Sequence, residues 1–292
     1  MQGGARTGQV GRTGRCRVKS SVIVCTYEAP RELDFVLAAL SRQTRMPDEI
    51  LVADDGSETP TRDVVDHWRA RMPCPLHHVH QADIGYRKAR IVNEAVRRSI
   101  GDHLLMLDGD SFPHRAWVDD HVSVADGRTV LCGRRVKLGP KFSAAMTRED
   151  IVSGHFDSVF TARFVASTLS GDTKRLFLGL RLPMPLVRVL HPRPRKLMGV
   201  NFSLPRGAFY AVNGHDEAWV VYGHEDRDIE LRLKRAGYPF RPLLNRAVVF
   251  HMWHRERERT EKTRDLLRSI EESKRMRCTR GLTGCAPFDP DM

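Results

Sequence analysis

The stretch His103-Leu-Leu-Met-Leu-Asp-Gly-Asp110 joins a short apolar run to two carboxylates, and Ser111-Phe-Pro113 follows it directly. An apolar run of this length bounded by turn-forming residues predicts a buried strand. Asp108 and Asp110 would then lie where that strand ends, at the rim of a sheet. Carboxylates in this position can share a divalent cation with a phosphate-bearing ligand, because Mg²⁺ and Mn²⁺ prefer oxygen ligands. A solvated turn is the alternative, since Asp and Gly are common in turns.

Strands and helices alternate upstream of this stretch. Apolar runs bounded by turn residues predict strands, and apolar residues at helical spacing predict the helices between them. Strands separated by helices of this length form βαβ units in a parallel sheet. We therefore expect an α/β fold with a mostly parallel central sheet flanked by helices. The predicted strands are Ser21–Tyr27, Glu49–Ala53, Leu76–Gln81 and His103–Leu107, and the predicted helices are Arg31–Gln43, Thr61–Arg71 and Lys88–Arg98.

Polar residues follow three of the predicted strands. They are Thr26-Tyr27, Asp54-Asp55 and Asp108-Gly109-Asp110. Open parallel sheets bind ligands at the carboxyl ends of their strands, so these groups are expected to meet at one ligand site. The chain has no G-x-G-x-x-G sequence and no P-loop sequence, which argues against a dinucleotide site or a P-loop site.

The second half of the chain places a run of acidic residues before a predicted helix. A short strand is predicted at Gly199–Arg206, and Gly223-His-Glu-Asp-Arg-Asp228 then leads into a helix that stops at Gly237. Glycine commonly ends a helix. Acidic side chains are favoured in the first turn of a helix, so capping alone could explain Glu225, Asp226 and Asp228.

The segment Phe240–His254 predicts a strand that ends in two histidines. His251 and His254 stand three residues apart and could ligate a metal ion. A pair of buried or stacked imidazoles is the alternative, and the spacing alone leaves both interpretations open.

The net charge of +12 is concentrated in two segments. Residues 1–20 contribute +5 and residues 141–198 contribute +6, so the rest of the chain is almost neutral at +1. A basic surface can bind nucleic acid, anionic lipid or an acidic substrate, or can simply be solvated. Two prolines, Pro183 and Pro185, prevent one continuous helix across the apolar part of the second segment. We expect a segment that rests on an anionic membrane, or an ordinary helical subdomain with a buried face.

Cysteine usage and hydropathy bear on location. The six cysteines form no C-x-x-C pair and indicate no disulfide framework, which favours a reducing cytoplasm. No stretch reaches the roughly 20 apolar residues that span a bilayer, and the N-terminus lacks the apolar region of a signal peptide. We expect a cytoplasmic protein divided into a disordered basic tail (1–20), an α/β half (21–140), a basic insertion (141–198), a second half with the acidic run and the two histidines (199–254) and a C-terminal helix with a tail (255–292).

Taken in order, these patterns resemble an inverting, metal-dependent family-2 glycosyltransferase of the GT-A fold. Val24-Cys-Thr-Tyr-Glu28 is similar to the family's opening strand, although Cys25 and Glu28 depart from its usual P-T-Y-N. Val52-Ala-Asp-Asp-Gly-Ser57 resembles the V-D-D-G-S element, Gln81–Asn93 resembles the nucleotide-contacting segment, and Asp108–Asp110 resembles the D-x-D.

The block Gly199–Gly237 resembles the C-terminal half of β-1,4-galactosyltransferases and chondroitin-type polymerases. Its G-G-E-D-x-D appears here with His224 in place of the second glycine. The resemblance implies Asp226 as general base, with Glu225 orienting the acceptor. It also implies Asp110 with His254, and His251 beside it, as ligands of Mn²⁺ or Mg²⁺.

The remaining implied contacts concern the donor, a UDP-sugar carrying a hexose or N-acetylhexosamine. Asp54 or Asp55 would meet the uracil or ribose, Asp108 the ribose or the metal's water shell, and Arg90, with Arg87 and Lys88, the diphosphate. The implied nucleotide-binding residues are Thr26, Tyr27, Glu28, Asp54, Asp55, Arg87, Arg90, Asn93, Asp108, Gly109 and Asp110. The implied acceptor is a glycan or lipid-linked saccharide in bacterial surface polysaccharide synthesis. The resemblance thus makes 21–140 the nucleotide-sugar-binding half and 199–254 the catalytic and acceptor-binding half, with 141–198 as an acceptor-binding lid or a membrane-proximal insertion.

Two other functions are considered. A sugar-phosphate nucleotidyltransferase also uses a nucleotide-binding α/β sheet, but the first strand ends in Thr26-Tyr-Glu-Ala-Pro30 without the expected Gly-rich basic signature. A nucleic-acid-binding protein would suit the +12 charge. However, only four Trp and five Tyr are present and no basic helix is interleaved with aromatic residues, so we expect no nucleic-acid partner.

Overall fold

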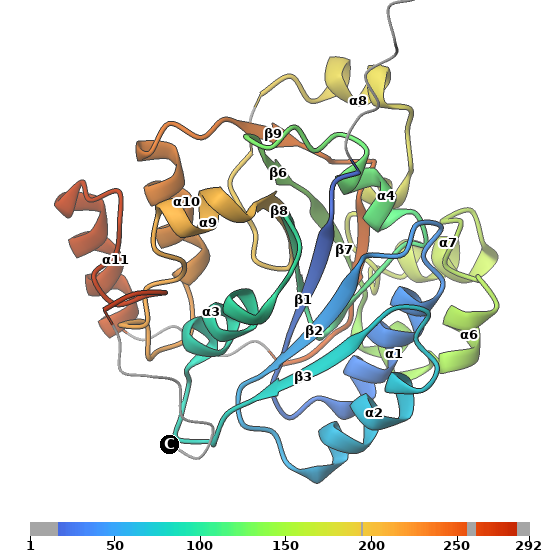
Figure 1. Cartoon of the computed structure of the whole chain (residues 1–292). Helices are drawn as coiled ribbons and strands as arrows, with labels where there is room; N and C mark the ends of the chain where they lie inside the picture. The colour runs from blue at the N-terminus through green and yellow to red at the C-terminus, as the bar shows by residue number, and fades with distance from the viewer. Residues whose placement is uncertain (1–16, 194, 256–260, 285–292) are drawn as a thin grey trace, which may run out of the picture.

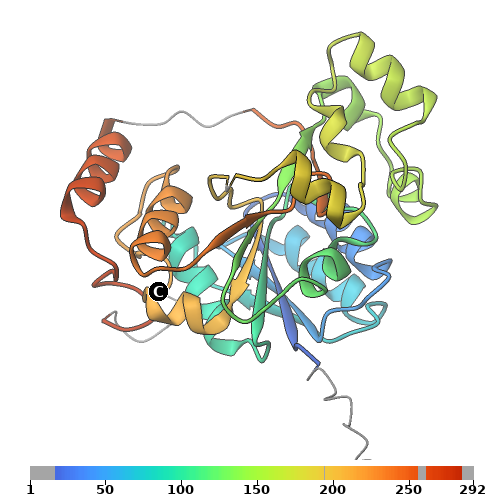
Figure 2. The same cartoon turned by 90° about the horizontal axis from the view of Figure 1, so that it is seen from above.

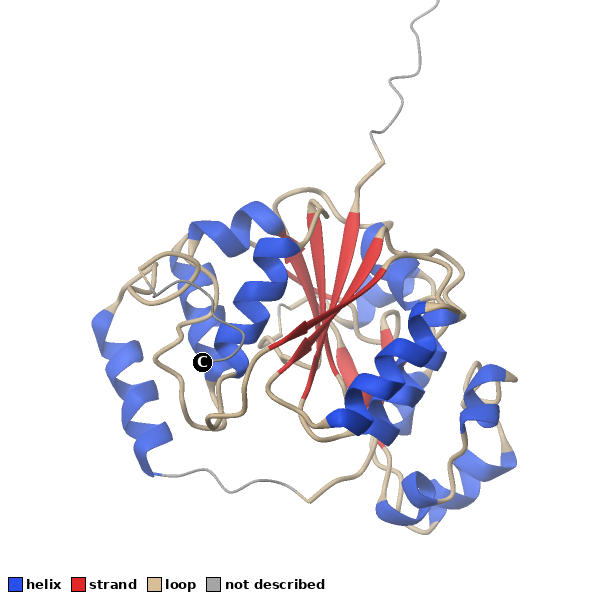
Figure 3. Cartoon of the chain, turned by 60° about the horizontal axis from the view of Figure 1, so that its bottom comes forward, coloured by secondary structure: helices blue, strands red, loops and turns tan. Residues whose placement is uncertain are grey.

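The computed structural model of the chain describes residues 17–193, 195–255 and 261–284. A seven-stranded sheet in the order β3-β2-β1-β4-β8-β6-β9 lies between two layers of helices (Figures 1 and 3). Its strands β1 to β4 are mutually parallel, and β8 runs antiparallel to both of its neighbours. The strands are β1 (Ser20–Thr26), β2 (Glu49–Asp54), β3 (Leu76–His80), β4 (His103–Asp108), β6 (Val130–Cys132), β8 (Asn201–Pro205) and β9 (Phe240–Pro242). The predicted α/β fold with a mostly parallel sheet is confirmed.

Each face of this sheet carries its own hydrophobic core because side chains alternate along a strand. In β1, Val22 and Val24 point into one core and Ile23 into the other. The first core packs against α1 (Pro30–Ser41) and α2 (Thr59–Arg69), and the second packs against α3 (Lys88–Arg98), α9 (Arg206–Ala211) and α10 (Glu225–Arg235). The central strands are therefore buried on both faces, which explains their continuous apolar sequence.

A small second sheet brings the C-terminal histidines to the end of β4. Its order is β5 (Ser111–Pro113), β10 (Val248–His251) and β7 (Arg134–Lys137). Here the prediction of one strand over Phe240–His254 is wrong, because β9 and β10 belong to different sheets. Asn245, at φ +58°, adopts the left-handed conformation that breaks an extended chain.

The segment 141–198 is helical, as expected. It contains α6 (Arg148–Val152), α7 (Ala162–Leu169), the 3₁₀ turn η1 (Leu176–Gly179) and α8 (Met184–Leu190), while α5 (Pro140–Ala144) leads into it. Figure 2 shows the yellow-green helices of this segment at one edge of the molecule. Helix α6 packs against α1, and Phe142, Ile151 and Phe164 belong to the first core. Thr147 and Asp150 form a reciprocal capping box at the start of α6.

The remaining helices are α4 (Trp117–Val122) and α11 (Glu261–Ser273), which packs on α10. The first sixteen residues of the predicted basic tail lie outside the described residues, as do 285–292. Within the described ranges, no helix combines the length and the apolar character that crossing a bilayer requires.

Candidate functional site

A cleft of about 1110 Å³ opens at the carboxyl ends of β1 and β4. The register of the sheet sets Cys25 opposite Asp108 and Thr26 opposite Asp54, so the polar strand ends lie at one level. The predicted residues that line the cleft are Thr26, Tyr27, Glu28, Asp55, Lys88, Asp108, Gly109, Asp110, His251 and His254. A cavity therefore lies where the sequence predicted a ligand site.

Asp110 and the two histidines form a compact group that could hold a metal ion. The Nδ1 of His251 lies 3.1 Å from one carboxylate oxygen of Asp110, and the Nε2 of His254 lies 3.1 Å from the other. One ligand atom from each of the three residues lies within 4.8 Å of the other two. Carboxylate oxygen with imidazole nitrogen is a donor set that suits Mn²⁺.

The same geometry controls the charges of these groups. Burial alone would raise the pKa of Asp110, but hydrogen bonds from His251 and His254 outweigh it and hold that pKa well below its ordinary value. The hydrogen bond with Asp110 raises the pKa of His254 to about 8. Asp110 is therefore an anion at neutral pH, as a metal ligand must be.

The pairing of β10 with β5 brings this group together. Antiparallel pairing places His251 opposite Ser111, and the backbone N–H of Met252 donates to the carbonyl of Asp110 at 3.0 Å. Ser111 also donates its hydroxyl to Asp110 at 2.7 Å. Sequence spacing indicated the two histidines, but only this pairing joins them to the acid 141 residues earlier.

A second cluster surrounds Lys88, which also lines the cleft. Its ammonium lies 2.9 Å from Asp108 and 3.7 Å from Glu225, and the hydroxyl of Tyr86 donates to Glu225 at 2.9 Å. Burial opposes the charge of Lys88, but these carboxylates raise its pKa well above the ordinary value. The second oxygen of Glu225 is buried and has no hydrogen-bond partner among the described residues. Buried polar atoms without a partner are uncommon in proteins.

Asp226 lies beside this cluster, at the first turn of α10, and neither Asp226 nor Glu225 is among the residues that line the cleft. Asp226 interacts electrostatically with Glu225, Lys88 and Asp108, and it accepts a 2.7 Å hydrogen bond from the backbone N–H of Gly199. Burial and the negative charge of Glu225 raise the pKa of Asp226 to about 7. The sequence prediction left capping open for this residue. Its perturbed pKa is typical of a catalytic group rather than an exposed cap.

The turn before α10 contains His224, the residue that replaces the second glycine of the G-G-E-D-x-D pattern. Gly223 has φ +101° and His224 has φ +70°, so both adopt conformations that glycine tolerates best. His224 holds the left-handed conformation at the N-terminal boundary of the helix. The unusual residue therefore retains the backbone path that presents Glu225 and Asp226.

The two acids after β2 have separate environments. Asp54 is fully buried and accepts hydrogen bonds from Ser57 and from His78 at 2.8 Å, so it fastens the loop after β2. Asp55 lines the cleft, where burial raises its pKa to about 6 despite hydrogen bonds from Gln81 and the backbone of Arg87. Of this pair, Asp55 is the one placed to meet a ligand.

Residues after β1 shape the same end of the cleft. The hydroxyl of Thr26 is buried without a hydrogen-bond partner among the described residues. Tyr27 donates its hydroxyl to Asp83 at 2.9 Å, and the backbone of Glu28, at φ +47°, donates to Ser57 at 2.9 Å. An unpaired buried hydroxyl at a cleft wall suits a ligand contact.

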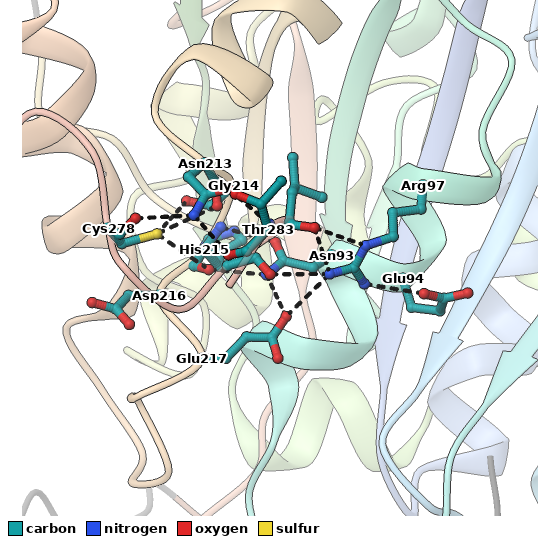
Figure 4. Close-up of polar contacts among 12 residues, drawn as sticks. Asn93, Glu94, Arg97, Asn213, Gly214, His215, Asp216, Glu217, Cys278 and Thr283 are labelled. Atoms are coloured by element: carbon teal, nitrogen blue, oxygen red, sulfur yellow. Dashed lines mark hydrogen bonds and ion pairs between the residues drawn. The ribbon is translucent and has the colours of Figure 1, made fainter. Parts of the chain in front are cut away.

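Four residues predicted to contact the nucleotide are not among those that line the cleft: Asp54, Arg87, Arg90 and Asn93. Asn93 is fully buried and joins α3 to the loop before α10, since it donates to the carbonyl of His215 and to Glu217, both at 2.9 Å (Figure 4). The guanidinium of Arg87 donates to the carbonyl of Ala82. The structure gives Asn93 and Arg87 contacts within the protein.

Several cleft residues carry no sequence signal that identified them. Arg135 on β7, Tyr222 before α10 and Arg264 on α11 all line the cleft. Tyr222 meets Tyr86 edge to face, with ring centroids 6.1 Å apart. No motif or spacing singles these residues out, because the pairing and packing of distant elements bring them to the site.

Comparisons with known proteins agree along most of the chain. The family model for glycosyl transferase family 2 matches residues 21–177, and a model described as the N-terminal domain of galactosyltransferase matches residues 190–255. A validoxylamine A glucosyltransferase from Streptomyces hygroscopicus subsp. limoneus is 30% identical over 227 residues, covering 75% of this chain and 48% of that protein. The chondroitin synthase of Pasteurella multocida is 33% identical over 118 residues, covering 39% of this chain and 12% of that protein.

Two solved structures share the fold at low sequence identity. S. aureus TarS 1–349 in complex with UDP has a TM-score of 0.55 at 15% identity, covering 88% of this chain and 65% of that one. The mannosyltransferase PcManGT from Pyrobaculum calidifontis, in complex with GDP-Man and Mn²⁺, has a TM-score of 0.54 at 16% identity, covering 90% and 64%. The chain spans about half the length of the Streptomyces glucosyltransferases that it matches.

Proposed function

The chain belongs to glycosyl transferase family 2 and has the GT-A fold, and on that premise we propose that it transfers a sugar from a nucleotide-diphosphate donor to an acceptor hydroxyl, with inversion at the anomeric carbon. The observation that carries the proposal is the set of acidic and basic groups at one cleft. Asp110, His251 and His254 line it together with Lys88 and Asp108. Asp226 lies behind this lining, close enough to interact with Lys88 and Asp108. Family membership favours sugar transfer over the nucleotidyl transfer and nucleic-acid binding considered above.

The donor in this proposal is a UDP-sugar carrying a hexose or N-acetylhexosamine. Its nucleoside would lie against Tyr27, Glu28 and Asp55, where Asp55 accepts from the uracil or ribose. Asp110, His251 and His254 would hold Mn²⁺ or Mg²⁺. When bound, the cation neutralises charge on the diphosphate as it leaves, which lowers the barrier by several kcal/mol. The UDP and the Mn²⁺ bound by structural neighbours support this choice.

Asp226 is the proposed general base. It takes the proton of the acceptor hydroxyl while that oxygen bonds to the anomeric carbon, and the bond from this carbon to UDP breaks on the opposite face. A base works best when its pKa is near the operating pH, and the pKa of Asp226 is about 7. The unpartnered oxygen of Glu225 would accept from a second acceptor hydroxyl and orient the nucleophile.

The decisive experiment separates chemistry from binding. Asp226→Asn keeps the shape and the hydrogen bond from Gly199 but removes the base, so turnover should fall by about 10²–10⁴-fold while the Kd for UDP changes little. Asp110→Ala should weaken both Mn²⁺ and UDP binding. Transfer would be followed by UDP release with each UDP-sugar in turn and Mn²⁺ present. Retention of more than about a tenth of turnover in Asp226→Asn would contradict the assignment of the base.

We also propose that the acceptor is a glycan or lipid-linked saccharide of a bacterial surface polysaccharide, met at an anionic membrane. Eight of the fifteen large apolar side chains exposed in the described residues lie between Val152 and Leu190. On α7, Ala162, Val165, Ala166 and Leu169 form an exposed apolar stripe, in which Leu169 is 83% exposed. A contiguous exposed apolar surface indicates an interaction site.

The charge of this segment favours lipid as the partner. Lys174, Arg175 and Arg188 are exposed on the same insertion, whose net charge is +6. Apolar side chains beside Lys and Arg are typical of helices that lie on anionic bilayers. Co-sedimentation with phosphatidylcholine vesicles, with and without phosphatidylglycerol, tests this. We expect salt-sensitive binding to the anionic vesicles that Val165→Ser with Leu169→Ser abolishes and exposed Thr168→Ala retains. Equal binding to both vesicle types would contradict it.

A further inference from the structure

We infer that Arg135 contacts the diphosphate of the nucleotide-sugar, an inference that rests on the proposed function. Arg135 lies on β7, where it pairs with Val249 of β10, two residues before His251. It lines the cleft together with Asp110, His251 and His254. A cation at this place stands beside the proposed metal ligands, where the leaving group would lie.

The hydrogen bonding of Arg135 points to a missing ligand. Its Nε is buried and has no hydrogen-bond partner within the part of the chain that the structure describes. Buried donors without partners are rare in proteins, and a guanidinium presents its donors in a planar fork that matches phosphate oxygens. A phosphoryl oxygen in the cleft would satisfy the buried donor.

The charges around Arg135 also call for an anion. Arg135 lines the same cleft as His251 and His254. A divalent cation on Asp110 and the histidines would add further positive charge to this cleft. Like charges that share a cleft are costly unless an anion lies among them. The diphosphate of the donor supplies that anion.

The cations expected from the sequence are engaged elsewhere. Lys88 is held by ion pairs with Asp108 and Glu225. The guanidinium of Arg87 donates to Ala82, and neither Arg87 nor Arg90 is among the residues that line the cleft. Arg135 therefore takes the role of diphosphate contact that the family resemblance implied for Arg90 and Arg87.

The neighbouring Arg134 provides a matched control. It is the next residue along β7, so its side chain leaves the opposite face of the strand. It is not among the cleft-lining residues and donates to the carbonyl of Gly133 at 2.8 Å. Arg134→Gln thus removes the same charge from the same strand without reaching the proposed phosphate site.

The experiment compares the Kd values for uridine and UDP, both measured with Mn²⁺. In Arg135→Gln we expect the preference for UDP over uridine to fall about tenfold to hundredfold, with the Kd for uridine unchanged. Arg135→Lys, which keeps the charge, should restore part of the preference, and Arg134→Gln should leave it intact. Circular dichroism of each variant confirms that it is folded.

The outcomes separate this inference from the proposed function. Wild-type preference for UDP in folded Arg135→Gln would overturn the role of Arg135 and leave the proposed function standing. A uridine Kd that weakens as much as the UDP Kd would also overturn it, because the residue would then act through the structure of the site. Wild-type protein that binds UDP no more tightly than uridine would remove the UDP donor itself, and this inference with it.

Discussion

The carboxylate of Asp226 and the backbone of Gly199 fit together so closely that no side chain could stand between them. The N–H of Gly199 donates to Asp226 at 2.7 Å, and a Cβ on residue 199 would lie only 2.4 Å from the other carboxylate oxygen. Gly199 precedes β8 and Asp226 begins α10, so this contact fixes the proposed base relative to the sheet. Residue 199 must be glycine because the Asp226 carboxylate approaches its backbone too closely for any side chain.

Gly199→Ala should therefore disable transfer with little loss of stability. The added methyl group must displace the Asp226 carboxylate, which can swing aside at small energetic cost but then no longer faces the acceptor. We expect kcat to fall at least about tenfold, since a small misplacement of a catalytic group is costly. The melting temperature and the Kd for UDP should stay close to wild type. Undiminished kcat would show that the position of Asp226 does not matter.

The pH dependence of kcat should report the ionisation of Asp226. The base must be ionised, so activity should rise with pH through a value near 7, the raised pKa of this group. The positive charge of Lys88 lowers that pKa, so Lys88→Met should move the rising limb to higher pH. A pH–rate profile of both proteins with saturating donor tests this. If the rising limb of Lys88→Met stayed at the wild-type pH or moved to lower pH, Lys88 would not lower the pKa of the catalytic base.

The same pKa predicts a gain in stability when the base is removed. The pKa of Asp226 is about 7 in the folded protein and near 3.8 when unfolded, so between these values the folded state binds more protons. Its contribution to stability therefore falls as pH rises through this window. Asp226→Asn cannot titrate, so its melting temperature should exceed that of wild type more at pH 8 than at pH 5. An equal difference in melting temperature between Asp226→Asn and wild type at pH 5 and at pH 8 would argue against a raised pKa of Asp226.

Metal binding should stabilise the protein through Asp110. A ligand that binds only the folded state at about 100 times its Kd adds about 2.7 kcal/mol to the free energy of unfolding. Mn²⁺ should therefore raise the melting temperature of wild type, and EDTA should abolish both this increase and transfer. Asp110→Asn should melt at the same temperature with and without Mn²⁺. Glu32→Gln, a carboxylate elsewhere in the cleft, serves as the control that keeps the response.

Substitution of Asn93 tests whether this residue contacts the nucleotide, as the sequence implied, or holds α3 to the loop before α10, as the structure indicates. The side chain makes two donated hydrogen bonds and accepts a third from the N–H of His215 at 2.9 Å. Asn93→Ala should lower the free energy of unfolding by about 2–4 kcal/mol, because each lost bond also leaves a buried partner unsatisfied. The Kd for UDP of the folded protein should not change. A large loss of UDP affinity in a fully folded variant would restore the nucleotide contact.

Local sequence was sufficient to predict the main elements. Apolar runs such as Val22–Val24 can be satisfied only by burial on both faces of a sheet, and helical spacing in Lys88–Arg98 fixed the boundaries of α3. Turn residues after these strands predicted where a ligand would bind. The prediction of one strand over Phe240–His254 was wrong. Asn245 adopts a left-handed conformation that interrupts the extended chain, and the two short strands on either side of it pair in different sheets.

The chemistry of the site followed from tertiary pairing that no local pattern contains. The sequence by itself determined a buried parallel sheet with acids at its rim, because hydrophobic periodicity and turn chemistry act over a few residues. Only the folded chain decided that Asp110 meets His251, that Asp54 and Asn93 turn inward, and that Arg135 faces the cleft. These are contacts between residues far apart in the chain, and strand register and packing set them once the whole core has formed.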